Sequence, residues 1–300
     1  MRACGEKETC VCVGVDPVYE RLPAEFLDDT RRRSARYRVD AIVRFCQTVM
    51  EVVAPHVPCV KLQSACFERY WWPGVEAYHR LIDHGRRLGL MVIADAKRGD
   101  IGISADHYAH GFLAPVDYED LDDLLGPDAL TVHAYLGVDA LEPMLEMSRQ
   151  ASRGLFALVR TSNPGGDVLQ GLSLGEGGTV ADATARMIAE AGAASCRLGR
   201  SGYSLLGAVV GATKPQDAVR LRGLMPEQIF LVPGFGAQGG KADDVRACFN
   251  PDGRGALVTA SRSILYAYQK DDRVSWPAAI EKATIHMKLQ IAEVCRPRGD

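Results

Sequence analysis

The chain changes from apolar to charged within one short stretch, Val92-Ile93-Ala94-Asp95-Ala96-Lys97-Arg98-Gly99-Asp100-Ile101-Gly102. Residues 91–94 form a short apolar run, which predicts a buried strand. Because side chains alternate along a strand, Asp95 and Lys97 should share one face, and a bend at Gly99 would turn Asp100 toward the same space. Two carboxylates beside one ammonium group would keep Lys97 protonated. The stretch therefore predicts either a salt-bridged strand end or a charged reactive site.

The composition is that of a globular protein with a small-molecule partner. Of 300 residues, 47% are hydrophobic and 24% are charged, which allows one large domain or two ordinary ones. The formal net charge of −3 argues against binding to nucleic acid or to an anionic membrane, because such surfaces require a basic excess. The chain has no apolar run of about 18 residues, and its polar start lacks the apolar core of a signal peptide. We expect a cytoplasmic protein, or an organellar one if the chain is part of a larger targeted polypeptide.

The nine cysteines show no pattern of disulfides or metal ligands. Their number is odd, and none forms a C-x-x-C pair with histidines nearby. Cys10 and Cys12 are better explained as buried residues at a strand start than as ligands. His107 and His110 have helical spacing but lack a third ligand. We therefore expect reduced thiols and no metal site.

Eight short apolar runs recur along the chain, most of them continuous, as in strands buried on both faces of a parallel sheet. Helical patterns separate these runs, with the clearest stripes in residues 39–53 and 180–191. The predicted strands are residues 11–15, 59–62, 91–94, 129–135, 155–160, 205–210, 229–232 and 256–260. This alternation predicts a (β/α)8 TIM barrel that forms one domain over residues 1–300, with an open doubly wound sheet as the alternative.

Polar residues gather at the carboxyl ends of the predicted strands. In a barrel these ends form one face, which carries the active site in essentially every characterised TIM-barrel enzyme. Each residue alone is more simply explained as a polar strand end, but their number favours a functional face. The residues are Asp16, Lys61, Gln63, Asp95, Lys97, Asp100, His133, Tyr135, Ser162, Asn163, Pro233, Gln238 and Arg262.

Two glycine-rich loops suit a lid and a phosphate site. Residues 163–178 follow the fifth predicted strand and have the length and composition of a mobile cover. Residues 233–240 follow the seventh strand, where glycines let backbone N–H groups approach a ligand just before a helix. Arg262, after the eighth strand, adds a guanidinium group at a place where barrels commonly bind phosphate. We therefore expect a phosphate between the last two loops.

The charged stretch resembles the D-x-K-x-x-D-I signature of the orotidine 5′-phosphate decarboxylase family, in the form Asp95-Ala96-Lys97-Arg98-Gly99-Asp100-Ile101. The similarity extends over nearly the whole chain, at Val15-Asp16-Pro17, Val60-Lys61, and residues 161–165, 232–240 and 261–264. The K-R-G-D-I form and the long insertion after the fifth strand are similar to the longer branch of the family, found in many bacteria and some single-celled eukaryotes.

This resemblance implies a lyase that converts orotidine 5′-phosphate to uridine 5′-phosphate and CO2, the last step of de novo pyrimidine biosynthesis. It also implies a TIM barrel that needs no metal or organic cofactor and forms a homodimer, with each active site at the subunit interface. Family members are sometimes fused to orotate phosphoribosyltransferase, so a fusion or association with that enzyme is left open.

The resemblance also implies roles for individual residues. Lys97 would protonate C6, Asp95 would lie beside the substrate carboxylate, and Lys61 would bind the ribose and Asp95. Asp100 would be donated by the other subunit, together with Ser104. The remaining substrate-binding residues would be Asp16 for the ribose, Ser162 for the pyrimidine, Gln238 for base and phosphate, and Pro233, Gly236, Gly239, Gly240 and Arg262 around the phosphate.

Two other functions fit part of the pattern. A magnesium-dependent sugar-phosphate synthase or decarboxylase of the same barrel superfamily shares the D-x-K-x-x-D core. However, Ser162 and Gln238 suit a pyrimidine, and Arg98 also favours the nucleotide enzyme. A catalytically silent barrel that binds a phosphate ligand is the third hypothesis, although the motif residues are all present.

Overall fold

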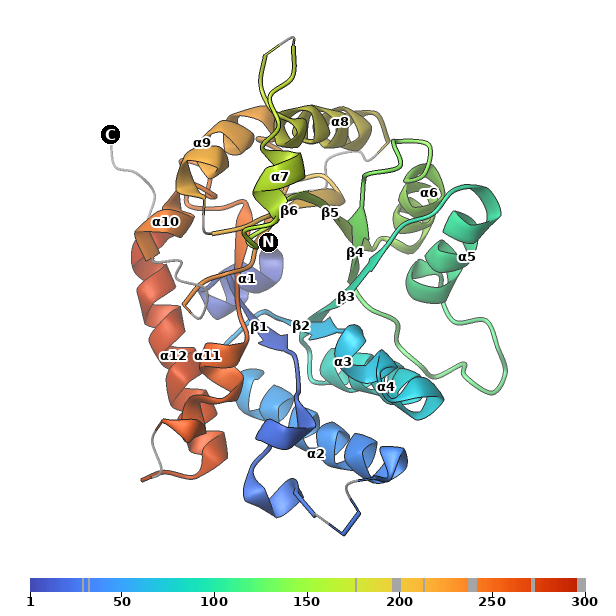
Figure 1. The fold of residues 1–300 in the computed structure, drawn as a ribbon, viewed down its shortest axis with the longest axis vertical. Coiled ribbons are helices and arrows are strands. Elements are labelled where there is room, and N and C mark those ends of the chain that lie inside the picture. Colours follow the sequence, from blue (N-terminus) through green and yellow to red (C-terminus); the bar gives the residue numbers. More distant parts are fainter. Residues whose placement is uncertain are drawn as a thin grey trace.

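Eight parallel strands form a closed barrel in sequence order, and β8 pairs with β1 to close it (Figure 1). The structure, a computed structural model, describes residues 1–28, 30–31, 33–175, 177–195, 201–212, 214–236, 242–270 and 273–295. The strands are β1 (Val11–Val15), β2 (Cys59–Gln63), β3 (Met91–Arg98), β4 (Ala129–His133), β5 (Gly154–Arg160), β6 (Leu206–Val210), β7 (Phe230–Val232) and β8 (Ala256–Ala260). The TIM-barrel prediction is confirmed, and the open sheet is excluded.

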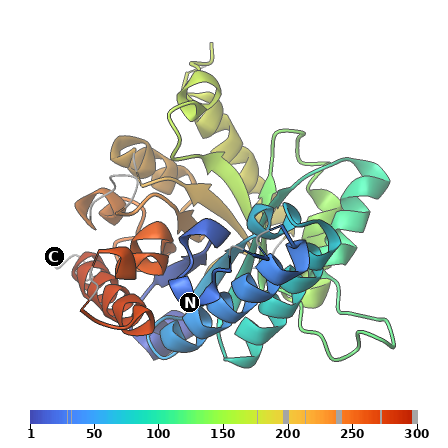
Figure 2. The same ribbon diagram turned by 60° about the horizontal axis from the view of Figure 1, so that its bottom comes forward.

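Helices cover the outside of the barrel, as Figure 2 shows from a second direction. The α-helices are α1 (Arg2–Lys7), α2 (Ala35–Val53), α3 (Ala65–Glu68), α4 (Trp71–Arg87), α5 (Gly102–Leu113), α6 (Glu142–Ala151), α7 (Gly166–Gln170), α8 (Val180–Ser195), α9 (Pro215–Leu224), α10 (Ala242–Arg246), α11 (Arg262–Leu265) and α12 (Trp276–Val294). Short 3-10 helices are η1 (Tyr19–Arg21), η2 (Ala24–Phe26) and η3 (Ala267–Gln269).

Helix α2 contains the apolar stripe predicted for residues 39–53. It begins earlier than the stripe because Ser34 caps it, accepting a 3.2 Å hydrogen bond from the Tyr37 backbone N–H. Its buried face includes Ile42 and Phe45, both fully enclosed. Burying such a side chain stabilises the fold by about 1.5–3 kcal/mol. The stripe thus fixes which side of α2 packs on the barrel.

The two ends of the barrel differ in chemistry. Near the strand starts, the interior is filled by a separate apolar cluster of Cys12, Cys59, Ile93, Ala129, Phe156, Val209 and Leu231. Helix α1 also lies at this end, because Ala3 and Cys4 line a cavity with Cys59 and Gly154 from the strand starts. The carboxyl end of the barrel, by contrast, encloses the charged side chains of Lys61 and Asp95. This leaves the carboxyl end as the face on which a site can form.

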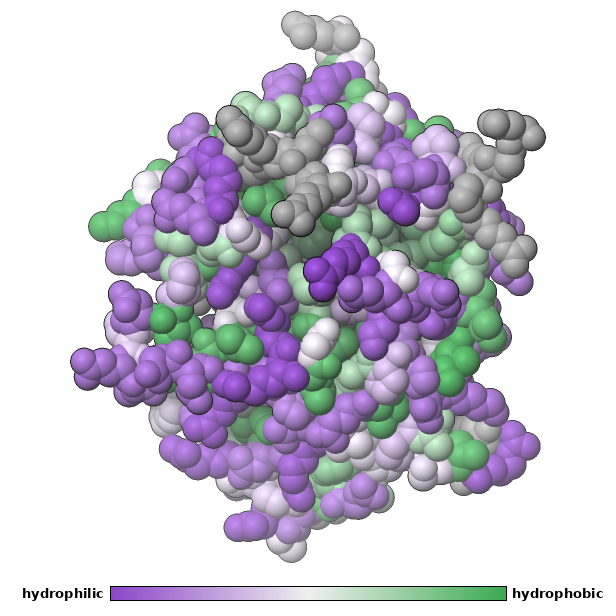
Figure 3. All heavy atoms as spheres, turned by 180° about the vertical axis from the view of Figure 1, so that it is seen from behind, coloured by the Kyte–Doolittle hydropathy of each residue, from purple (hydrophilic) through white to green (hydrophobic). Residues whose placement is uncertain are grey.

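The surface is mainly polar. Figure 3, which views the molecule from behind Figure 1, shows polar side chains over most of that face and a hollow with apolar side chains near its middle. Among the helices that the structure describes, none combines the length and apolar character needed to cross a membrane.

Candidate active site

Asp95 lies at the centre of a buried hydrogen-bond cluster near the carboxyl ends of β2, β3 and β4. Its Oδ2 atom accepts from Lys61 Nζ at 2.5 Å and from Gln63 Nε2 at 3.1 Å. Its Oδ1 atom accepts from Lys97 Nζ at 2.6 Å and from Thr131 Oγ1 at 2.8 Å. Lys61, Asp95 and Lys97, three of the four residues predicted to be catalytic, therefore meet.

The cluster fixes the charge of its members. Burial opposes ionisation of Asp95, but the charges and hydrogen bonds of Lys61 and Lys97 outweigh it and lower the pKa of Asp95 to about 2. Burial likewise opposes protonation of Lys61, but the carboxylates of Asp16 and Asp95 raise its pKa above the ordinary value. At neutral pH Asp95 is therefore a carboxylate and Lys61 an ammonium group.

The bend that places Lys97 differs from the expected one. The predicted strand covers residues 91–94 and the predicted bend lies at Gly99, whereas β3 continues to Arg98 and the left-handed residue is Lys97, with φ of 49°. The pairing of β3 with β4 shifts register over the same residues, and the Lys97 N–H donates to Thr131 Oγ1 at 3.0 Å. A non-glycine residue in this region costs about 1–3 kcal/mol. The contacts with Thr131 and Asp95 hold Lys97 in this conformation.

A cavity of about 110 Å³ lies beside the cluster, and Lys61 is part of both. Lys61 Nζ lies 3.9 Å from Asp16 Oδ1. Among the described residues, that oxygen and Thr259 Oγ1 are buried and have no hydrogen-bond partner, although buried polar atoms are nearly always paired. Hydroxyl groups of a bound ligand could satisfy both. The lining residues are Asp16, Lys61, Pro233, Gly234, Phe235, Thr259, Ala260, Ser261 and Arg262.

The same cavity brings together the loops predicted to hold a phosphate. Pro233 and Arg262 both line it. The approach of the β8 loop requires glycine at position 14, because a Cβ there would lie 1.8 Å from Ser261 Oγ. Gly236, with φ of 73°, follows the lining residues of the β7 loop. Gln238, Gly239 and Gly240 lie outside the described residues.

Asp100 does not join the charged cluster of its own chain. Its carboxylate accepts a 2.8 Å hydrogen bond from the Ile101 N–H, and within the described part of the chain it forms no ion pair with Lys97. The turn before it is set by His133, whose Nε2–H donates to the Gly99 carbonyl at 3.2 Å. A Cβ at position 99 would lie 2.4 Å from the His133 ring. The expectation that Asp100 turns into the cluster of its own chain is therefore wrong.

The surface around Asp100 is apolar. Ile101 is 59% exposed and Ile103 is 74% exposed. Ser104, also predicted as a site residue, is partly buried in the first turn of α5 and is not among the residues that line the cavity. Asp100 and Ser104 thus lie together beside exposed isoleucines and outside the cluster.

Ser162 lies in the loop between β5 and α7, and ion pairs hold α7 to the barrel. Arg160, buried at the end of β5, forms an ion pair with Asp167 of α7. Lys214 also contacts Asp167, at 2.7 Å, and Gln170 accepts the Thr161 N–H at 2.9 Å. The loop expected to be a mobile cover therefore begins with a short helix tied to the barrel.

Gln63, which was predicted at the carboxyl end of the second strand, and two side chains that were not predicted complete the site. Gln63 and Thr131 bind Asp95, and Thr259 lines the cavity. Thr131 and Thr259 each interrupt an apolar run, which is the only sequence signal that marks them. Over the described residues, no group of three or more histidine, cysteine or acidic side chains is arranged to hold a metal ion.

Comparison with known proteins identifies the family. The sequence model of the "Orotidine 5′-phosphate decarboxylase / HUMPS family" matches residues 10–275. The orotidine 5′-phosphate decarboxylase of Rhodopirellula baltica is 43% identical over 286 residues, which cover 93% of each chain.

Two solved structures from Leishmania donovani are also similar. Its OMP decarboxylase has a TM-score of 0.72 and 26% identity, with 98% of this chain and 97% of that chain covered. Its UMP synthase has a TM-score of 0.71 and 28% identity, with 97% of this chain but 56% of that chain covered. The family model matches most of the chain, and the Rhodopirellula baltica relative is 43% identical to it. The chain therefore belongs to the orotidine 5′-phosphate decarboxylase / HUMPS family.

Proposed function

We propose that this chain removes CO2 from orotidine 5′-phosphate to give uridine 5′-phosphate, the last step of pyrimidine biosynthesis. Residues 1–300 form one catalytic barrel domain, which acts in the cytoplasm as a homodimer. The observation that carries the proposal is the carboxylate of Asp95, held ionised between Lys61 and Lys97 beside a cavity with unpaired buried oxygens. The 43% identity to a decarboxylase named for this reaction supports it.

The chemistry requires a positive group beside one carbon atom. Loss of CO2 from C6 leaves an electron pair in the plane of the ring, where the ring cannot delocalise it, so a fixed cation must stabilise it. Lys97 Nζ is an ammonium donor anchored 2.6 Å from Asp95 Oδ1. It therefore serves as both the cation and the proton donor to C6, while Asp95 lies beside the carboxylate that leaves.

One ammonium group supplies only part of the acceleration. A charge pair at about 4 Å is worth about 4 kcal/mol at an effective dielectric constant near 20, whereas the largest enzymatic accelerations need up to about 23 kcal/mol. Binding of the ribose and phosphate supplies the remainder by forcing C6 and its carboxylate into the charged cluster. Lys61 belongs to both the cavity and the cluster, so a ligand bound in the cavity lies next to the charged groups.

The unpaired oxygens of the cavity suit the ribose. Asp16 Oδ1 accepts a hydrogen bond from one ribose hydroxyl group. Lys61 donates a hydrogen bond to a ribose hydroxyl oxygen while it also binds Asp95. Thr259 Oγ1 offers a further partner in the same cavity.

The phosphate and the base are held by the loops around this cavity. Arg262, with the β7 loop from Pro233 through Gly236 to Gly240, binds the phosphate. Ser162 and Gln238 read the pyrimidine edge.

Asp100 and Ser104 complete the site of the other subunit. Asp100 lies outside its own charged cluster, next to the exposed Ile101 and Ile103. A two-fold dimer uses the same patch on both chains, so an interface that buries these isoleucines would also bring each Asp100 against the partner. This apolar patch supports the homodimer.

The magnesium-dependent alternative fits the cluster less well. A divalent cation needs carboxylate oxygens with free lone pairs, whereas each oxygen of Asp95 already accepts from an ammonium group. The similarity to a UMP synthase that is longer than this chain supports association with orotate phosphoribosyltransferase as a secondary proposal.

The test is to mix the purified protein with orotidine 5′-phosphate in EDTA and follow the absorbance of the orotate chromophore. We expect its loss at a rate that EDTA and added Mg²⁺ leave unchanged. Activity restricted to sugar phosphates and dependent on Mg²⁺ would establish the alternative enzyme, and binding without turnover would establish a silent barrel.

A further inference from the structure

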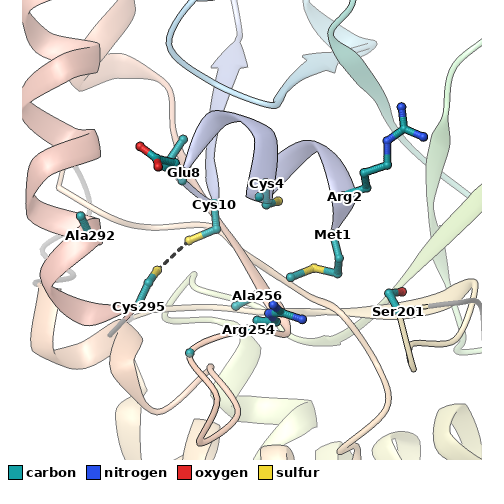
Figure 4. A pocket seen from close by; sticks show the side chains of 13 residues that line it. Met1, Arg2, Cys4, Glu8, Cys10, Ser201, Arg254, Ala256, Ala292 and Cys295 are labelled. Carbon is teal, nitrogen blue, oxygen red and sulfur yellow. Dashed lines mark hydrogen bonds between the residues drawn. The ribbon is translucent and has the colours of Figure 1, made fainter. Parts of the chain in front are cut away.

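Two cysteines from opposite ends of the chain meet at the amino-terminal end of the barrel. Cys10 directly precedes β1, and Cys295 directly follows α12. Their Sγ atoms lie 3.0 Å apart although 285 positions separate them. Figure 4 shows the two sulfur atoms facing each other. A disulfide has an S–S length of about 2.05 Å, so an approach of about 1 Å would join them.

One of the two thiols is open to reagents. Cys10 is buried, whereas Cys295 is only partly buried. Both line a cavity of about 600 Å³ between α1 and the strand starts (Figure 4). Arg2, Glu8 and Arg254 are also among the lining residues, but the Arg2 guanidinium is exposed and forms an ion pair with Glu6. This cavity is large enough for a small molecule, and Arg254 can bind a carboxylate on it.

We propose that Cys10 and Cys295 are a redox-active thiol pair, which a carboxylate-bearing low-molecular-weight disulfide oxidises to a disulfide bond across this end of the barrel. The proposal does not depend on the catalytic assignment, because the pair lies at the opposite ends of the strands from Asp95 and Lys97.

The two thiols differ in a way that orders the reaction. The hydrogen bond with Cys10 and the charge of Arg246 lower the pKa of Cys295 against the effect of burial. The same hydrogen bond and burial raise the pKa of Cys10. Since the thiolate is the nucleophile, the more accessible, partly buried Cys295 reacts first and the buried Cys10 second.

The exchange balances in two steps. The Cys295 thiolate attacks one sulfur of the small disulfide, whose S–S bond breaks and releases one thiolate. Cys10 then loses its proton to water and attacks the Cys295 sulfur of the mixed disulfide, which releases the second thiolate. The two protein thiols are oxidised, the small disulfide is reduced to two thiols, and the two cysteine protons end on the leaving groups.

The bond would close nearly the whole chain into a loop. Closing a long loop restricts the unfolded chain more than closing a short one. Because β1 and β8 are the strands that close the barrel, a bond from the start of β1 to the end of α12 also fixes the closure. We expect the thermal midpoint to rise by about 5 °C on oxidation.

The experiment titrates the full chain with glutathione buffers from fully reduced to fully oxidised. We expect two of the nine thiols to be lost, a Cys10–Cys295 cross-linked peptide in a non-reducing digest, and a higher thermal midpoint that dithiothreitol reverses. Cys10→Ser and Cys295→Ser should abolish all three changes, and Cys10→Ala provides a second variant if the buried serine impairs folding.

The matched control is Cys4→Ser, because Cys4 lines the same cavity but lies outside the pair. This variant should behave like the wild type. Glutathione attached to Cys295 without a cross-link would overturn the proposal. So would a cross-link between Cys12 and Cys59, or one that includes Cys4, or full retention of thiols in the most oxidising buffer.

Discussion

The hydroxyl group of Thr131 donates a 2.8 Å hydrogen bond to Asp95 Oδ1, the same oxygen that accepts from Lys97 Nζ, and it also accepts the Lys97 N–H. One side chain of β4 therefore holds both the carboxylate and the backbone of the lysine. Thr131 is a positioning residue, because it acts through Asp95 and Lys97.

Replacing Thr131 with valine should lower kcat by roughly 10- to 100-fold, since a hydrogen bond to a charged group is worth about 1.5–3 kcal/mol. The dissociation constant of uridine 5′-phosphate should change little, because the product lacks the reacting carboxylate. Thr131→Ser keeps the hydroxyl group and should retain most activity. Equal kcat values for the valine and serine variants would show that Thr131 has only a packing role.

Acid should reveal the depressed pKa of Asp95. Its folded-state pKa of about 2 lies below the ordinary value of 3.8, so its contribution to stability is complete above about pH 4 and is lost as the pH falls toward 2. The contribution is about 2 kcal/mol. Denaturant unfolding of the wild type and of Asp95→Asn between pH 5 and 2.5 should therefore show the wild type losing roughly 1–2 kcal/mol more than the variant. A constant difference across this range would contradict the depressed pKa.

Arg262→Ala should weaken nucleotide binding through the phosphate alone. Loss of a charge-assisted contact should raise the dissociation constant of uridine 5′-phosphate by roughly 10- to 100-fold, whereas the weak binding of uridine should not change. Arg254→Ala, at the other end of the barrel, removes the same charge and serves as the control. A loss of uridine binding equal to that of the nucleotide would place Arg262 away from the phosphate.

The barrel could be predicted from the sequence because most strands are continuous apolar runs and polar residues gather at or near their carboxyl ends. That pattern located Asp16, Lys61, Asp95 and Lys97. It could not locate Thr131, whose hydroxyl group lies within an apolar run, because only the register of β4 against β3 shows that it reaches Asp95.

Other features depend on the folded backbone. The left-handed conformation of Lys97 follows from the register shift of β3, and periodicity carries no sign of it. The pairing of Cys10 with Cys295 joins two distant segments through the closure of the barrel, so no local motif could predict it.

Mixed dimers test the shared site. Lys97→Ala and Asp100→Ala chains should each be inactive alone, but a mixed dimer would contain one pocket with both residues intact. With random exchange half of the dimers are mixed and half of their pockets are complete, so activity should recover to about a quarter of wild type. No recovery after exchange is verified with mass-tagged chains would show that Asp100 acts within its own subunit.

The assignment of Lys97 as the proton donor is tested most directly by Lys97→Ala, measured both for turnover of orotidine 5′-phosphate and for affinity toward uridine 5′-phosphate. Removal of the cation and the proton donor should lower turnover by at least about 1,000-fold. The product should still bind within about tenfold of the wild-type affinity, because ribose and phosphate contacts carry most of the binding energy. Turnover within about tenfold of the wild type, with the product still bound, would contradict the role of Lys97.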